Sequence, residues 1–199
     1  MSDLKNVTIL FPGSFKPIHI GHMNLIEKYL NDPLVKEIKI FIGPGIRDNI
    51  DSTLSLKIMK LLWPSYKEND ITIDIVKYPS PILTCYKFIE TAPIGNYAIA
   101  SSSKGKDAIR IKEFVNNFNV LKKYTKPEGV NIIEFPVDIT PLCYTRRTDD
   151  KNGTPISSTI LRQDIANNDY ENFKTHYLGY DENIILNVWW TIITQIDPL

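Results

Sequence analysis

The chain has 199 residues, 43% of them hydrophobic and 23% charged, and its 23 basic side chains balance 23 acidic ones. These values are typical of a soluble globular protein with one well-packed domain. The zero net charge argues against broad binding to nucleic acid or to a membrane surface. Cys85 and Cys143 fit no metal-ligand spacing and are interpreted as thiols in a reducing compartment. With a polar N-terminus and no membrane-length apolar run, we expect a cytoplasmic protein.

Strand-like and helix-like segments alternate along the chain. Runs rich in Ile, Val and Phe predict strands at 6–12, 36–43, 70–77, 96–101 and 130–137. Apolar residues spaced three and four apart predict helices at 20–31, 52–63, 81–91, 105–118, 156–167, 168–177 and 182–196. This alternation predicts an α/β fold with a doubly wound parallel sheet and C-terminal helices.

Two parts of the chain are expected from this order of elements. Residues 1–167 are predicted to form the main domain, and residues 168–199 a helical extension packed on it. The last predicted helix is apolar around much of its circumference and carries Trp189 and Trp190. We expect it to pack on the core or on a second copy of the chain, so a homo-oligomer stays open.

The segment Phe11-Pro-Gly-Ser-Phe-Lys-Pro-Ile-His-Ile-Gly-His22 lies between the first predicted strand and the first predicted helix. His19 and His22 are three residues apart, so both side chains project from one face of the first helical turn. Unpaired backbone N–H groups and the helix dipole favour an anion there. Gly13 and Gly21 leave room for a ligand close to the backbone. Transfer of a nucleotidyl group, with the imidazoles donating to a phosphate, fits this arrangement.

Residues 13 to 22 resemble the signature of the nucleotidyltransferases with the HIGH motif, which appears here literally as His19-Ile-Gly-His22. A second family element, a Ser/Thr-rich helix start, is similar to Pro155-Ile-Ser-Ser-Thr-Ile-Leu-Arg162. The resemblance implies a Rossmann-like fold that binds a nucleoside triphosphate. It also implies that the two histidines stabilise charge on the α-phosphate while an acceptor attacks and pyrophosphate leaves. Mg²⁺ is expected as a cofactor held mainly by the phosphates, since no protein-built metal site is predicted.

Other residues of the first motif have two interpretations each. Ser14 and Phe15 are predicted to face the triphosphate through backbone N–H groups, while Phe15 could equally plug the core. Lys16 departs from the acidic or amide residue that many relatives carry near this position. It is predicted either to contact the α-phosphate or the acceptor's anion as a catalytic residue, or to be a solvated lysine.

In the second motif, Ser157, Ser158 and Thr159 form either a simple N-cap series or part of the nucleotide site. Arg162 is one turn further along and could grip the β- and γ-phosphate oxygens with both arms of its guanidinium. Together with His19, His22 and Lys16, Arg162 completes the predicted catalytic set.

Three further side chains are predicted to bind ligands. Asp107 and Arg110 follow the fourth predicted strand and either contact the nucleotide or form an exposed ion pair. The Gly-x-Asp pattern that the family carries in this region is blurred. Arg47 is a possible partner for an acceptor phosphate, and loops 44–50, 78–84 and 138–154 are expected to build the acceptor pocket.

The form of both motifs favours one subfamily. The Ile-Ser-Ser-Thr sequence and the Gly-Ser-Phe-x-Pro opening look like nicotinamide- or nicotinate-mononucleotide adenylyltransferases, which implies ATP and a phosphorylated small-molecule acceptor. A cytidylyltransferase or a phosphopantetheine-type adenylyltransferase is the alternative, and a non-catalytic nucleotide-binding protein is an alternative of another class. The chain is too short for a class I aminoacyl-tRNA synthetase and lacks Lys-Met-Ser-Lys-Ser.

Overall fold

The computed structural model describes residues 6–64, 68, 70–101, 105–135, 137, 144–145 and 154–196, with only the backbone described at 105–108, 144–145 and 154–155. Five strands form one parallel sheet: β1 (Val7–Gly13), β2 (Val35–Ile42), β3 (Ile71–Ile75), β4 (Gly95–Ile99) and β5 (Val130–Ile132). Their order is β3-β2-β1-β4-β5, with β1 at the centre. The sheet is therefore Rossmann-like and doubly wound, as the sequence predicts.

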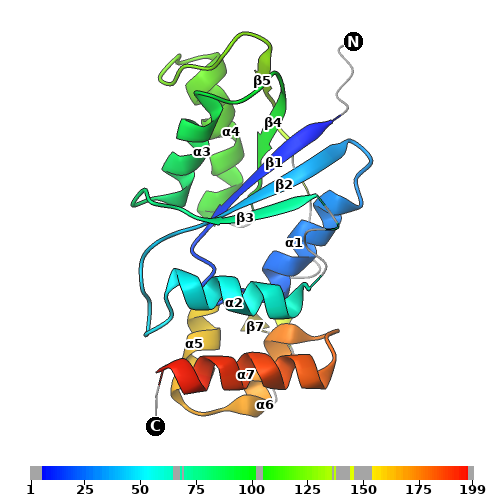
Figure 1. Cartoon of the computed structure of the whole chain (residues 1–199), viewed down its shortest axis with the longest axis vertical. Helices are drawn as coiled ribbons and strands as arrows, with labels where there is room; N and C mark the ends of the chain where they lie inside the picture. The colour runs from blue at the N-terminus through cyan, green and yellow to red at the C-terminus, as the bar shows by residue number, and fades with distance from the viewer. Residues whose placement is uncertain are drawn as a thin grey trace.

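The helices are α1 (Ile20–Leu30), α2 (Ser52–Leu62), α3 (Pro81–Ile89), α4 (Gly105–Asn119), α5 (Ser158–Ala166), α6 (Tyr170–Lys174) and α7 (Glu182–Ile196), with a 3₁₀ turn, η3 (Thr175–Tyr177). Helices α3 and α4 cover one face of the sheet, while α1 and α2 lie on the other (Figure 1). Helices α5, α6 and α7 gather beyond α2, at one end of the molecule (Figure 1). A two-residue strand β6 (Tyr144–Thr145) pairs antiparallel with β7 (Thr154–Pro155).

Local signals account for several helix starts. The Asp51 carboxylate accepts a hydrogen bond from the Leu54 backbone N–H at 2.7 Å and caps α2. Pro81 occupies the first turn of α3, where its missing N–H leaves no helical bond unmade. Asp169 caps α6 through the Asn172 N–H at 3.0 Å. Each of these three helices therefore begins beside a residue type that favours a helix start.

Two hydrophobic cores hold the layers together. The core between the sheet, α3 and α4 is rich in aromatic rings, including Tyr86, Phe114 and Phe118. The other core joins the sheet to α1 and α2, and buried side chains of α5, α6, η3 and α7 belong to the same cluster. In α7, Trp189 is buried in this cluster, whereas Trp190 is 55% exposed. The boundary between the main domain and the helical extension, expected at residue 167, stays a prediction.

Two predicted elements differ from those observed. The strand expected at 130–137 ends at Ile132, although the Ile133 N–H still donates to the Tyr97 carbonyl of β4 at 3.0 Å. The apolar side chains of Ile133, Phe135 and Val137 pack on the core beyond the end of this strand. The helix expected at 168–177 is divided into α6 and η3. In the described part of the chain, no helix is long and apolar enough to span a membrane.

Candidate functional site

A cavity of about 520 Å³ lies at the carboxyl end of β1. This volume falls within the range typical of small-molecule sites, about 300–1,000 Å³. The strand order reverses between β1 and β4, which is where doubly wound sheets bind ligands. The lining residues come from both sequence motifs and from the segments after β3 and β4: Phe11, Pro12, Gly13, Ser14, Phe15, His19, Gly21, His22, Leu25, Ser80, Pro81, Ile82, Ala100, Ser101, Arg110, Ile156, Ser157 and Ser158.

His19 and His22 form a stacked pair at the cavity wall. Their ring centroids are 3.9 Å apart and the rings are inclined by only 27°. His19 is the N-cap of α1, and its backbone N–H donates to Nδ1 of His22 at 3.4 Å. This bond assigns the proton of a neutral His22 to Nε2, the nitrogen then available to donate to a ligand.

Burial lowers the pKa of His22 from its ordinary value to about 4. The imidazole is therefore neutral near pH 7 in the ligand-free protein. A neutral imidazole with Nε2–H is a hydrogen-bond donor, while the first-turn N–H groups of α1 supply positive potential. The His22 imidazole can thus donate to an anionic oxygen without itself taking up a proton.

The Phe15 ring packs against the His22 imidazole. The Phe15 ring makes edge contacts with Phe11 and His22, at centroid distances of 5.2 and 5.1 Å. The side chain is only 2% exposed, so it packs as a core residue even though it also reaches the cavity. Its φ of 51° places a non-glycine residue in the left-handed region, a strain typical of ligand-binding loops.

The two glycines of the first motif are required by these rings. A Cβ at Gly13 would fall 2.5 Å from Cζ of Phe15. A Cβ at Gly21 would lie 3.2 Å from Cε1 and Nδ1 of His19. Any side chain at Gly13 would therefore displace the Phe15 ring, and one at Gly21 would press on His19.

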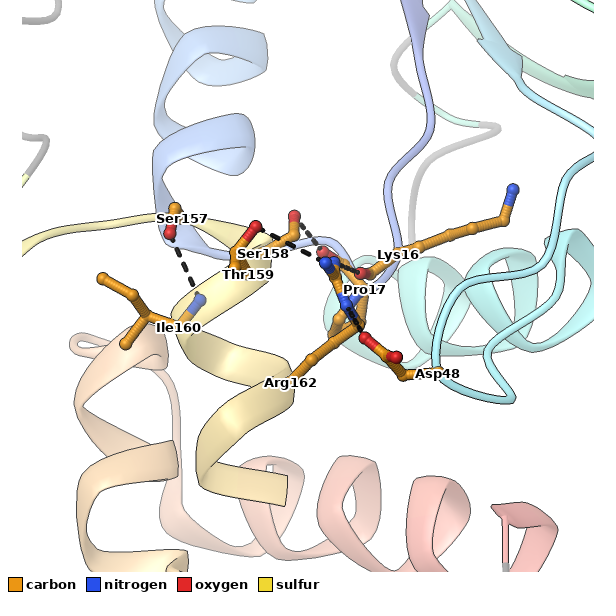
Figure 2. A network of polar contacts seen from close by, with 8 residues as sticks. All are labelled: Lys16, Pro17, Asp48, Ser157, Ser158, Thr159, Ile160 and Arg162. Atoms are coloured by element: carbon orange, nitrogen blue, oxygen red, sulfur yellow. Dashed lines mark hydrogen bonds and ion pairs between the residues drawn. The ribbon is translucent and has the colours of Figure 1, made fainter. Parts of the chain in front are cut away.

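The start of α5 is tied directly to the first motif (Figure 2). Ser158 Oγ donates to the carbonyl of Pro17 at 2.9 Å, and Arg162 Nη1 donates to the carbonyl of Lys16 at 2.7 Å. Arg162 Nε also donates to Asp48 Oδ2 at 2.5 Å. The two motifs, more than a hundred residues apart in sequence, thus form one hydrogen-bonded unit.

The hydroxyl groups at the start of α5 make different hydrogen bonds. Ser157 is the N-cap, and its Oγ accepts from the Ile160 N–H at 3.3 Å. Arg162 Nη2 donates to Thr159 Oγ1 at 3.4 Å. Ser157 and Ser158 line the cavity, whereas Thr159 and Arg162 do not. The capping interpretation is confirmed for Ser157, and its contact with a nucleotide stays a prediction.

Lys16 is not the solvated lysine considered from the sequence, and its contact with a phosphate or with the acceptor stays a prediction. Its side chain extends away from the Arg162 guanidinium (Figure 2), is 1% exposed, and donates from Nζ to the Gly43 carbonyl at 2.6 Å. Burial, followed by the nearby charge of Arg47, lowers the pKa of this amine. The contact ties the loop after β1 to the end of β2, and it places Lys16 outside the cavity lining.

Of the remaining predicted site residues, some line the cavity and others do not. Arg110 of α4 lines the cavity, whereas Arg47 lies in an exposed turn bridged to Ile50 and does not. The side chain of Asp107 and most of loop 138–154 lie outside the described residues.

Some residues that line the cavity were not among those predicted from the sequence. Leu25 lines the cavity from α1, and Ile156 precedes the Ser157 cap. Ser80, Pro81 and Ile82 come from the expected acceptor loop 78–84, and Ser101 follows β4. Because carboxyl ends of parallel strands meet at one edge, the residues after β3 and β4 carried a usable signal.

A metal ion finds few anionic ligands here. Among the side chains that the structure describes, no group of three or more His, Cys, Asp or Glu residues could hold a metal, and no carboxylate lines the cavity.

Comparison with solved structures places the fold among Rossmann-like α/β proteins. One similar structure is the Plasmodium falciparum nicotinic acid mononucleotide adenylyltransferase complexed with APC, with 16% identity, a TM-score of 0.53, and coverage of 98% of this chain and 100% of that one. The same enzyme complexed with NaAD has 16% identity, a TM-score of 0.48, and coverage of 96% and 97%. No family model and no curated protein matches the chain.

Proposed function

We propose that this protein is a nucleotidyltransferase that transfers AMP from ATP to a mononucleotide acceptor and releases pyrophosphate. The stacked imidazoles at the start of α1, facing a cavity at the switch point of the sheet, carry this proposal. The fold shared with a nicotinic acid mononucleotide adenylyltransferase supports it and favours nicotinate mononucleotide as the acceptor.

In the proposed reaction an acceptor phosphate oxygen attacks the α-phosphorus in line, and the bond to the β-phosphate oxygen breaks. His19 and His22 donate to the non-bridging α-phosphate oxygens, where negative charge is concentrated. Such a reaction needs little covalent help, so fixed donors and positioning supply the rate enhancement. His22 Nε2–H is suited to this role because its Nδ1 already accepts from His19.

The α5 start is proposed to hold the departing pyrophosphate. Ser157 and Ser158, at this helix start, line the cavity, and the first backbone N–H groups of a helix favour an anion. Arg162 would reach the phosphates by exchanging its contact with Asp48, whose side chain is 71% exposed.

A cation for the acceptor comes from α4. Arg110 of this helix lines the cavity and is proposed to neutralise a phosphate or carboxylate of the mononucleotide. Mg²⁺ is proposed to enter with the triphosphate, where it would neutralise phosphate charge. We further propose that the reaction takes place in the cytoplasm.

The test is pyrophosphate release from purified protein with Mg²⁺. ATP and CTP are each paired with nicotinate mononucleotide, nicotinamide mononucleotide, phosphopantetheine and phosphorylated alcohols and sugars. Release with ATP and nicotinate mononucleotide supports the proposal. Release with CTP, or with phosphopantetheine, replaces it by the corresponding nucleotidyltransferase. Binding of ATP without release in any pair contradicts catalysis and favours a nucleotide-binding protein.

The His19→Ala variant tests the role of the imidazoles. Removing one donor to a developing charge lowers the turnover number by about 10²–10³ in comparable sites. Glu27→Ala, an exposed change on the same helix, is the control and should leave turnover intact. Unchanged pyrophosphate release in His19→Ala would contradict the proposed role of this residue.

A further inference from the structure

Two consecutive residues of η3, His176 and Tyr177, contact α5 and the loop that carries the first motif. The hydroxyl of Tyr177 donates to the carbonyl of Ile18 at 2.7 Å. Nε2 of His176 lies 2.9 Å from Oδ2 of Asp164, on α5. Neither Tyr177 nor His176 lines the cavity.

The Tyr177 hydroxyl bonds to the residue that directly precedes His19. Ile18 is joined by its peptide bond to His19, the N-cap of α1 and one member of the stacked pair. Tyr177 is fully buried, and burial raises the pKa of its phenol, so the hydroxyl stays protonated and acts as a donor. The bond therefore restrains the peptide plane from which the His19 backbone begins.

The segment that carries Tyr177 is itself packed in the hydrophobic core. The Tyr177 ring lies 5.2 Å from Phe173, whose ring lies 4.8 Å from that of Trp189. Thr175 Oγ1 donates to the Asn172 carbonyl at 2.6 Å and closes the turn between α6 and η3. The hydrogen bond from Tyr177 to the Ile18 carbonyl, here called the tether, thus links the His19 backbone to the helical core rather than to a surface loop.

We propose that Tyr177 is a positioning residue for His19, and that the contact between His176 and Asp164 keeps this tether in register with α5. The C-terminal helices would then set the distance between the α-phosphate site and the pyrophosphate site. This inference rests on the proposed function and extends it to residues that touch no substrate.

The matched variants are Tyr177→Phe and Tyr97→Phe. Tyr97 is also buried, and its hydroxyl donates to the Pro93 carbonyl at 2.9 Å. It lies on β4, and neither it nor Pro93 lines the cavity. Both substitutions remove one hydroxyl and one bond to a backbone carbonyl, so a general loss of stability should affect both variants alike.

The kinetic readout separates positioning from stability. In Tyr177→Phe we expect kcat for pyrophosphate release to fall about tenfold or more, because small misplacements of a catalytic group can cost about 10²-fold. KM for ATP should stay within about twofold, since the phosphate-binding N–H groups remain. Tyr97→Phe should keep kcat while its melting temperature falls similarly. Equal kcat values in the two variants would overturn the proposal.

A second readout does not depend on turnover. Amide hydrogen exchange at residues 18–22 should be faster in Tyr177→Phe than in the wild type, and unchanged there in Tyr97→Phe. Unchanged exchange in Tyr177→Phe overturns the tether whatever the activity of the protein. A wild-type protein that releases no pyrophosphate overturns the proposed function, whereas an inactive pocket with faster exchange still supports the tether.

Discussion

The starts of α1 and α5 meet at the same cavity but use their side chains differently. At α1, the imidazoles of His19 and His22 line the cavity directly. At α5, Ser158 and Arg162 donate to the carbonyls of Pro17 and Lys16, in the loop that carries those imidazoles. One helix start presents donors to a ligand, and the other holds the loop in place.

This difference explains how a short glycine-bearing loop can carry a defined site. Phe15 has a positive φ, which costs about 1–3 kcal/mol in a typical protein. Two charged groups, Arg162 from α5 and Lys16 from the loop itself, stabilise the loop by bonds to backbone carbonyls. The second motif is therefore as much a part of the structure of the first as a ligand site of its own.

The largest expected effect tests which helix start acts on the reacting group. His22→Ala should lower kcat by about 10²–10³, since it removes a donor aimed at developing charge. Ser157→Ala, at the other helix start, should lower it far less. Steady-state pyrophosphate release measures both, and the reverse ranking would break the comparison.

The holding role of α5 predicts a stability cost at Arg162. Arg162→Ala should destabilise the fold by about 1.5–3 kcal/mol, because it removes charge-assisted bonds to Lys16 and Asp48. Asp48→Asn should cost less than about 1 kcal/mol, since this partner is exposed. Urea unfolding measures both values. Equal losses would show that the Lys16 carbonyl contact matters little.

The ring packing of the first motif predicts a cost at Gly13. Gly13→Ala should destabilise the protein by about 1–3 kcal/mol, because the new methyl group overlaps the Phe15 ring. Gly45→Ala is the matched control, since a Cβ there has no neighbour within 4 Å and the residue is exposed. Thermal unfolding should separate the two variants, and similar melting temperatures would contradict the tight packing of Phe15.

The buried state of His22 predicts a dependence of stability on pH. Between about pH 6.5 and pH 4 the unfolded chain binds a proton at this residue that the folded chain does not, so stability falls as the pH falls through this window. His22→Asn should flatten this part of the profile. Urea unfolding at several pH values gives the comparison, and parallel profiles for the two proteins would contradict the lowered pKa.

The smallest expected effect concerns one hydroxyl of α5. Ser158→Ala should cost about 1 kcal/mol through the lost bond to the Pro17 carbonyl. Thr194→Ala removes a hydroxyl that donates to the Trp190 carbonyl on the exposed side of α7, and should cost less than about 0.5 kcal/mol. A larger loss in Thr194→Ala would break the assignment of Ser158 as a structural clamp.

The elements of the fold were predictable because their signals are local. Alternating β-branched runs and helical spacings predicted the five strands and the helices to within a few residues in most cases. Errors arose where apolar residues pack on the core beyond the end of a strand, as at Ile133 and Phe135. Apolar spacing reports burial, and burial alone does not decide which backbone is paired.

For the site, the sequence by itself placed the first motif at the edge of the parallel sheet, because that motif follows the first strand. The second motif follows β7, outside the parallel sheet, and only its resemblance to a family element predicted that it lies at the same site. Only the tertiary structure decided what each side chain does there. Lys16 is directed to the Gly43 carbonyl and Arg162 to the carbonyl of Lys16. Tyr177 reaches the carbonyl of Ile18 across more than a hundred and fifty residues. Such bonds depend on distances between separate elements, which no local pattern encodes.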